Sequence, residues 1–320
     1  MNKSLSLAAA HWDKLQKFDW LSRRSRWWHS ASIIRHINRH ICGQALDGIT
    51  AGDIALLKSR YPSRKFAKAI SIGCGNGSKE LELVKAGLVE HFDLFEISSA
   101  SIKQGRILAK NATAGSSMSF HQLAVDMTEP TDIAKYDLVY WNNALHHMLD
   151  VPQAMHWSKA KLKAGGVIYI NDFIGPDRMQ WTPEMLHIAS SVRASLPKRM
   201  LRHPLLPWRK LPTQVIAISV ADIIRIDPTE CADSARMLHA FKESFHGGLI
   251  IPTGGLVYHT ALNDVIGNIN ETRHAHIMKL LLLLDDMTIT HGLSQYCVMV
   301  GDQGYDHHVV SASTPSLPLN

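Results

Sequence analysis

The stretch Ala69-Ile70-Ser71-Ile72-Gly73-Cys74-Gly75-Asn76-Gly77-Ser78 decides the fold of this chain. It begins as a short apolar strand and runs directly into three alternating glycines, Gly73, Gly75 and Gly77. The apolar positions that follow have helical spacing: Leu81, Leu83 and Val84. Because glycine lets the backbone pass tightly over a ligand at the carboxyl end of a parallel strand, we expect a ligand-binding loop here. A plain strand-turn-helix junction is the alternative.

The spacing of the glycines separates this loop from two phosphate-binding motifs. A dinucleotide fingerprint would have its third glycine at position 78, where this chain has Ser78. A phosphate loop would contain Gly-Lys followed by Ser or Thr, which the stretch lacks. The loop resembles instead the nucleoside-binding loop of class I S-adenosylmethionine (SAM) dependent methyltransferases, in which these glycines approach the methionine part of SAM.

Short apolar segments alternate with helical patterns over residues 66–175. The segments lie near 68–73, 91–96, 118–123, 136–142 and 166–173. This alternation predicts a parallel sheet with helices on both faces. Leu162-Lys163-Ala164-Gly165-Gly166-Val167 is similar to the Leu-x-x-Gly-Gly turn before the fifth strand of the methyltransferase family. The resemblance implies an α/β, Rossmann-like seven-stranded methyltransferase sheet.

The rest of the chain predicts additions to a SAM-binding α/β core at 61–175. Residues 1–60 are expected to form a helical N-terminal cap, because isoleucines at 33, 34, 37 and 41 have helical spacing and Gly43 suits a helix end. Residues 176–225 are rich in proline and predict a helical lid over the sheet edge. Residues 226–310 are expected to complete the sheet with a helix at 234–245, a strand at 247–251, a helical insertion near 256–290 and a last strand at 295–300, and 311–320 to be a disordered tail.

Polar residues at the ends of the predicted strands suit contacts with SAM. Glu96 ends the second strand, where its carboxylate can accept hydrogen bonds from the ribose hydroxyls. In the family an acidic residue at the position of Asp126 meets the adenine amino group, Met127 packs on the ring, and the position of Asn142 lies beside the methyl group. The alternatives are a solvated charge for Glu96 and a turn residue for Asp126.

Position selects a few of the nineteen histidines for chemistry. His146 and His147 follow the fourth strand, and His259 follows the Gly254-Gly255 turn after a later strand. His147 and His259 are therefore expected to face one cavity as catalytic residues, with His239 or His146 as a third donor to Zn²⁺ or Fe²⁺. A general base without a metal, and a purely structural role, are the alternatives.

Further motifs resemble a bacterial group of small-molecule enzymes, the α-keto acid C-methyltransferases of peptide-antibiotic biosynthesis. They are Trp27-Trp28 with Arg35-His36-Ile37-Asn38, the run Gly175–Thr182, Asp227-Pro228-Thr229-Glu230, and Gly254-Gly255 with His259. The resemblance implies methylation of the carbon beside the ketone of a 2-oxo acid, helped by a histidine-bound metal. Candidate substrate contacts in the cap and lid are Trp28, Arg35, Arg178, Gln180, Trp181 and His187.

Charge and composition leave other acceptors open. The net charge is +6, and residues 1–40 contain eight Lys or Arg against Asp13 and Asp19. This surplus fits a basic cap over a small anionic acceptor, since tryptophans and isoleucines in the segment indicate a packed helix. An RNA-binding arm is the rival interpretation, but no RNA-recognition module accompanies it. Metal-free O- or N-methylation of a sugar or secondary metabolite is the main alternative function.

The remaining features concern the compartment and the assembly. Cys42, Cys74, Cys231 and Cys297 are scattered, which fits a reduced cytosol and a cytoplasmic protein. No apolar run reaches the roughly 18 residues of a membrane span, and the N-terminus has no secretory signal pattern. We expect no membrane and no nucleic-acid partner, and a homodimer is compatible with the sequence.

Overall fold

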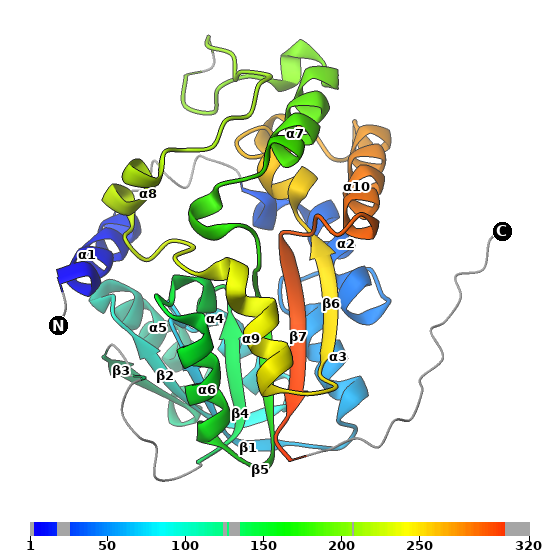
Figure 1. Ribbon diagram of the computed structural model, residues 1–320. Helices are drawn as coiled ribbons and strands as arrows, with labels where there is room; N and C mark the ends of the chain where they lie inside the picture. Colours follow the sequence, from blue (N-terminus) through cyan, green and yellow to red (C-terminus); the bar gives the residue numbers. More distant parts are fainter. Residues whose placement is uncertain (1–2, 18–25, 124–126, 128–134, 207, 305–320) are drawn as a thin grey trace.

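The computed structural model describes residues 3–17, 26–123, 127, 135–206 and 208–304. The predicted adenine contact Asp126 and the predicted disordered tail 311–320 lie outside the described residues. A seven-stranded sheet forms the centre of the molecule (Figure 1). Its strands are β1 Phe66–Ile72, β2 Val89–Glu96, β3 Met118–Gln122, β4 Tyr136–Asn142, β5 Leu162–Phe173, β6 Leu249–Gly254 and β7 Tyr296–Asp302.

The strand order is β3-β2-β1-β4-β5-β7-β6. Strands β1 to β5 pair in parallel, and β7 is antiparallel to both β5 and β6. The predicted sheet is confirmed, with its strands at or within a few residues of the expected positions. From β1 the chain adds β2 and β3 on one side, and then crosses back to add β4 and β5 on the other side of β1. In open α/β sheets, ligands bind outside the carboxyl ends of the strands at such a reversal.

Alternate residues of β4 enter two separate cores. Leu138 and Tyr140 belong to the core on one face of the sheet, whereas Val139 and Trp141 belong to the core on the other. Side chains of a strand point to opposite faces in turn, so a strand covered on both faces is apolar throughout. This explains why β4 is an almost continuous apolar run in the sequence.

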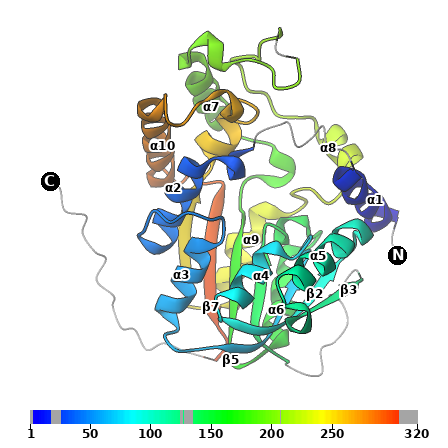
Figure 2. The ribbon, with the colours of Figure 1, turned by 180° about the vertical axis from the view of Figure 1, so that it is seen from behind.

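Ten α-helices in the described part of the chain surround the sheet. They are α1 Lys3–Lys17, α2 Ala31–Cys42, α3 Ala51–Arg60, α4 Ser78–Lys85, α5 Ser99–Asn111, α6 Val151–Lys161, α7 Pro183–Ser195, α8 Val220–Ile226, α9 Met237–Ser244 and α10 Ala275–Thr290. Helices α6 and α9 lie on the face seen in Figure 1, and α3, α4 and α5 on the face seen in Figure 2. Helices α1, α7 and α8 lie beyond the carboxyl ends of the parallel strands (Figure 1). No helix of the described residues is long and apolar enough to cross a membrane.

Two details of the helices show how local sequence sets their limits. Helix α2 begins after Ser30, whose hydroxyl accepts from the N–H of Ile33, and ends at Gly43 with φ of 76°. This matches the expected helix and its expected end. The predicted helical stretch 256–290 contains two helices, a π-helix Leu256–Ala261 and α10, separated by turns. Asn, Asp and Gly residues between 263 and 270 favour those turns.

Candidate active site

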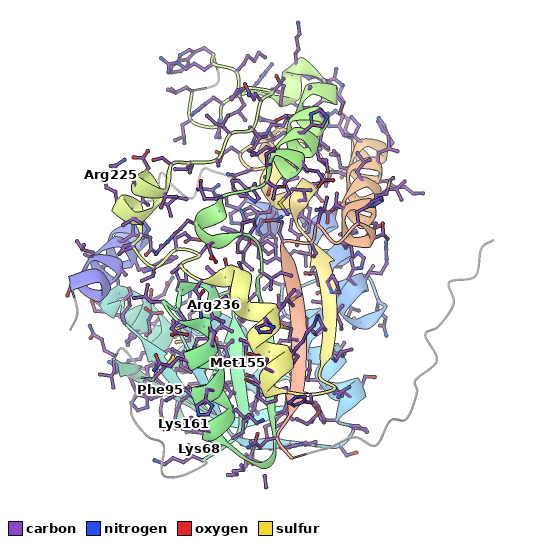
Figure 3. The ribbon with its side chains drawn as sticks, in the orientation of Figure 1. Lys68, Phe95, Met155, Lys161, Arg225 and Arg236 are labelled. Atoms are coloured by element: carbon purple, nitrogen blue, oxygen red, sulfur yellow. The ribbon has the colours of Figure 1, made fainter. Side chains whose placement is uncertain are left out.

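A cavity of about 550 Å³ opens at the carboxyl ends of β1, β2 and β4. Phe95, labelled in Figure 3, lines it near the end of β2. Most of the residues that the sequence selects for the cofactor also line it: Gly73, Gly75, Glu96, Met127 and Asn142. The predicted acceptor contact Trp28 and the predicted catalytic residue His147 line it as well. The cavity therefore lies at the reversal of strand order, where the fold predicts a ligand.

The three glycines of the loop have two different functions. Gly75 has φ of 58°, and a Cβ added there would have no atom within 4 Å, so it would occupy the open cavity. A Cβ on Gly73 would lie 3.0 Å from the Cβ of Ala144. Gly77 does not line the cavity, because its Cβ would contact core side chains at 3.2 Å: Leu94, Met118 and Phe120. Gly73 and Gly75 thus shape the cavity, whereas Gly77 permits close packing of the helix on the sheet.

Glu96 ties the loop to the end of β2. Its Oε2 accepts from the N–H of Gly75 at 2.8 Å, and its Oε1 accepts from the N–H groups of Ile97 and Ser98, each at 2.8 Å. Burial raises the pKa of the Glu96 carboxyl, although the three backbone donors act against this. Carboxylate oxygens accept more than one hydrogen bond each, so capacity is left for ligand hydroxyls on the cavity side.

Lys79 is a cavity residue that sequence reasoning missed. Its Nζ lies 2.7 Å from Oδ1 and 3.0 Å from the backbone oxygen of Asn142. Burial lowers the pKa of the Lys79 ammonium. The amide nitrogen of Asn142 donates to Tyr140 and Asp53, so its side chain is fully engaged by the protein. Asn142 lines the cavity, so its contact with SAM stays a prediction, and its oxygens orient the buried ammonium of Lys79.

Asp53 connects the N-terminal helices to this network. It lies on α3 and is fully buried. Its carboxylate accepts from Tyr169 at 2.5 Å, Asn171 at 3.0 Å, Asn142 at 3.0 Å and Tyr140 at 3.4 Å. Burial raises the pKa of the Asp53 carboxyl. A single aspartate in a helix carries no sequence signal for this role, because its partners come from β4 and β5.

His146 forms a buried ion pair behind the cavity. Its Nδ1 lies 2.5 Å from Oδ1 of Asp172, which also accepts from the N–H groups of Ala144, Leu145 and Phe173. Burial acts to lower the pKa of His146, but the Asp172 carboxylate outweighs it and raises that pKa. His146 is thus held by Asp172 at the end of β4, behind the cavity.

His147 faces a turn that contains two acidic residues. Its Nδ1 lies 3.0 Å from the hydroxyl of Thr229 and 3.8 Å from Oδ2 of Asp227. That Oδ2 is buried without a hydrogen-bond partner. Burial, reinforced by neighbouring His146, lowers the pKa of His147 to about 4. His147, Asp227 and Glu230 offer ligand atoms within 4.8 Å of one another. A neutral imidazole with two carboxylates has the composition of a metal site.

Glu230 stands among the histidines of the site. Burial acts to raise the pKa of its carboxyl, but the imidazoles of His147, His146 and His259 outweigh this and lower it. Asp172, Asp227 and Glu230 thus bring three carboxylates together. Among the described residues, the ion-pair partners of Asp227 and Glu230 are histidines. The nearby Arg178 does not pair with these carboxylates, because its guanidinium donates to the backbone oxygens of Pro228 and Glu230. Buried carboxylates in excess of cations favour a bound cation.

The predicted metal set His147, His259 and His239 is not assembled. His259 lies in the π-helix, with its Nδ1 3.0 Å from the hydroxyl of Tyr296. The ring of Phe173 contacts both His146 and His259, with centroids 6.4 Å and 5.9 Å away. His239 lies on the outer side of α9 with its side chain 75% exposed, paired with Glu243. Helical phase turns His239 to solvent, which the residue's position in the chain did not reveal.

The predicted substrate contacts do not all lie at the cavity. Trp28 lines the cavity, and Trp12, which was not selected, lies edge-on to His147 with ring centroids 5.5 Å apart. Arg35 lies on the outer side of α2, paired with Asp47, and His187 is exposed on α7. Three others are engaged by the protein itself: Arg178 donates to the carbonyls of Pro228 and Glu230, Gln180 to those of Arg178 and Ile218, and Trp181 to Gln295.

Residues 64–214 match the family model described as a methyltransferase domain. This region is a class I SAM-dependent methyltransferase domain. The match spans the glycine loop, the cavity strands and most of the predicted lid at 176–225. SAM is therefore the cofactor of this enzyme, and the open space at Gly75 and the remaining acceptor capacity of Glu96 fit it.

Solved structures with a similar fold are distant in sequence. Geranyl diphosphate C-methyltransferase from Streptomyces coelicolor A3(2) is 13% identical, with 80% of this chain and 79% of that chain covered and a TM-score of 0.47. Phosphoethanolamine N-methyltransferase 2 from Haemonchus contortus is 11% identical, with 86% and 57% covered and a TM-score of 0.49. The [4+2]-cyclase SpnF is 11% identical, with 85% and 93% covered and a TM-score of 0.45.

Proposed function

We propose that this methyltransferase methylates a small anionic metabolite, and that the reaction is metal-assisted C-methylation of a 2-oxo acid. The observation that carries the proposal is the turn Asp227–Glu230 beside His147. The unpartnered, buried Oδ2 of Asp227 lies 3.8 Å from His147, and Glu230 completes the ligand group. Because His147 and Thr229 line the cavity, this group is reached from the side where SAM binds.

The donor set suits a divalent cation such as Zn²⁺ or Fe²⁺, with one imidazole and two carboxylates as ligands. When bound, such a cation supplies Lewis acidity that makes the carbon beside a ketone more acidic. The chain's own residues do the rest. His146 and Asp172 fix the strand end that precedes His147, and Arg178 fixes the carbonyls of the acidic turn.

Positioning of the acceptor is the second contribution of the protein. Trp12 and Trp28 border the cavity on the side of the N-terminal helices. Because the cavity measures about 550 Å³ and also has to hold SAM, it favours a small acceptor over a polymer. SAM, when bound, supplies the methyl group on its sulfonium. Holding donor and acceptor in line converts the transfer to an effectively unimolecular step.

Metal-free O- or N-methylation is a second candidate, favoured by one hydrogen-bond pattern. The hydroxyl of Thr229 donates to Oδ1 of Asp227 at 2.6 Å, so its oxygen accepts from Nδ1–H of His147. This fixes the neutral tautomer with a free Nε2, which is the arrangement of an oriented base. A base with its pKa lowered to about 4 is weak near neutral pH, which ranks this candidate second.

Proton exchange separates the two candidates. Purified enzyme is incubated without SAM in D₂O with a panel of 2-oxo acids, and NMR follows exchange at the carbon beside the ketone. We expect exchange that chelator abolishes, that added Zn²⁺ or Fe²⁺ restores, and that Asp227→Asn removes while SAM binding persists. Asp222→Asn, an exposed carboxylate on α8, is the matched control. If methyl transfer stays at its full rate in the presence of chelator, and 2-hydroxy acids are better acceptors than the matching 2-oxo acids, the metal-free candidate is supported instead.

A further inference from the structure

A second histidine cluster lies outside the cavity, between α2 and α10. His36 and His40 are four residues apart on α2, so they lie on one face of the helix. Their ring centroids are 4.7 Å apart. Asp286 of α10 faces both rings, with its Oδ1 2.7 Å from Nε2 of His40 and 3.5 Å from Nε2 of His36. Figures 1 and 2 both show α2 beside α10.

Nε2 of His36 has no hydrogen-bond partner in this cluster. His36 is only 3% exposed, and its Nε2 is buried without a hydrogen bond. The nearest carboxylate oxygens, on Asp286 and Asp285, are 3.5 Å and 3.7 Å away, too far for a good hydrogen bond. A buried polar nitrogen without a partner is costly, so the site lacks a group that would satisfy it.

We propose that His36, His40 and Asp286 bind a zinc ion that joins α2 to α10. The three residues offer ligand atoms within 4.8 Å of one another. Zn–N and Zn–O bonds of about 2.0–2.1 Å in a tetrahedron place the ligand atoms about 3.3 Å apart. The 3.5 Å between His36 and Asp286 already matches this spacing. The 2.7 Å between His40 and Asp286 requires a small outward movement, which the 41% exposed Asp286 side chain permits.

The charges around the cluster allow a cation. Asp285 adds a second, fully buried carboxylate 3.7 Å from His36. Arg39 and Lys279 line the groove beside the cluster and oppose a cation, whereas Arg35 in the same groove is paired with Asp47. The groove also reaches His36 and Asp286, so water can complete the coordination from that side. Three protein ligands and one water describe an open site.

The zinc ion would stabilise more than the two helices. Asp285, next to the ligand Asp286, accepts from the N–H groups of Gly255 at 3.1 Å and Val257 at 2.8 Å. These groups begin the π-helix that carries His259. The ion would therefore fix α2 against the segment that carries His259.

Metal titration of the full-length protein tests this site. Protein stripped with chelator is titrated with Co²⁺ and then Zn²⁺, and the visible Co²⁺ bands and calorimetric stoichiometry are recorded. We expect the wild type to bind one more equivalent of metal tightly than His40→Gln or Asp286→Asn. We also expect metal at this site to raise the Tm of the wild type but not that of either variant. Because the side chain of Asp286 is 41% exposed, the Asp286→Asn variant should fold even if His40→Gln does not. Circular dichroism and SAM binding check that each variant is folded.

Two further variants keep the outcome unambiguous. His239→Gln, which removes an exposed histidine next to a carboxylate, should leave the stoichiometry unchanged. Asp227→Asn should remove only metal bound at the cavity, so failure of that site is distinguishable from failure of this one. If His40→Gln and Asp286→Asn bind as much Zn²⁺ as the wild type with the same affinity, the α2–α10 site is overturned.

Discussion

The carboxylate of Asp53 accepts a 3.0 Å hydrogen bond from the side-chain amide of Asn142. This bond joins helix α3, near the N-terminus, to the end of β4 at the cavity. Asn142 in turn accepts from Lys79, so one chain of polar contacts runs from the N-terminal helices to the cofactor loop. Because the chain is buried, each of its members depends on the others for satisfied hydrogen bonds.

Replacing Asp53 should therefore affect both stability and SAM binding. In Asp53→Asn the new amide group faces the donors of Tyr169 and Asn171, and we expect a loss of about 1–3 kcal/mol in the free energy of unfolding. Urea denaturation and calorimetric titration with SAM measure the two effects. Tyr140→Phe removes the longest of the four bonds and should cost less. Equal stability of Asp53→Asn and wild type would contradict the role assigned to this network.

The glycine loop offers a test with a matched control. Gly75→Leu places a side chain in the open cavity, and we expect SAM affinity to fall at least tenfold. Gly87→Leu introduces the same kind of backbone strain, since Gly87 has φ of 70° and also has no atom within 4 Å of an added Cβ. It lies outside the cavity, so its SAM affinity should be unchanged. Similar SAM affinities in the two variants would show that strain alone, and not occupation of the cavity, is being measured.

Trp12 should matter for the acceptor more than for SAM. Its ring lies edge-on to His147, so Trp12→Ala opens the cavity beside the proposed reaction centre. We expect kcat to fall by roughly tenfold or more, about 1.4 kcal/mol in the barrier, with a smaller change in SAM affinity. Trp12→Phe should restore part of the rate. Trp208, which is 76% exposed, provides the control Trp208→Ala, and a rate loss there equal to that of Trp12→Ala would refute the assignment.

Acid should weaken the sheet through Asp93. Burial acts to raise the pKa of this carboxyl, but the hydrogen bonds from Lys68 and Tyr136 outweigh it and lower the pKa below its ordinary value of 3.8. A lowered folded-state pKa gives stability that is present above about pH 4 and is lost as the pH falls through the folded value. Lys68 is labelled in Figure 3, at the end of the sheet away from the cavity.

The variant Asp93→Asn should therefore be less stable than wild type at pH 6, and the difference should shrink below pH 4. Thermal unfolding monitored by circular dichroism between pH 3 and 7 follows both proteins. Glu82→Gln removes the carboxylate of an exposed ion pair with Lys85 and serves as the control. A stability difference that stays constant across this pH range would show that the charge of Asp93 is not its cause.

The spacing and type of neighbouring residues predict the glycine loop, the strands and the helix ends. The glycine loop, the apolar strands and the end of α2 at Gly43 follow from backbone freedom, apolar runs and capping, and the structure confirms them. The cavity residues Gly73, Gly75 and Glu96 were predicted for the same reason, because each lies at the end of a recognisable strand.

Only the tertiary structure decided which distant side chains meet. The sequence gives no signal for Asp53 and Lys79 as site residues, since a single charged residue in a helix is ordinarily exposed. Asp227 and Glu230 belong to a motif of the resemblance, but the motif assigns them no role at the site. His239 was selected by its position in the chain, but the orientation of α9 turns it to solvent. Burial, helix orientation and the pairing of strands far apart in sequence fix such contacts, and none of these is encoded by the spacing of neighbouring residues.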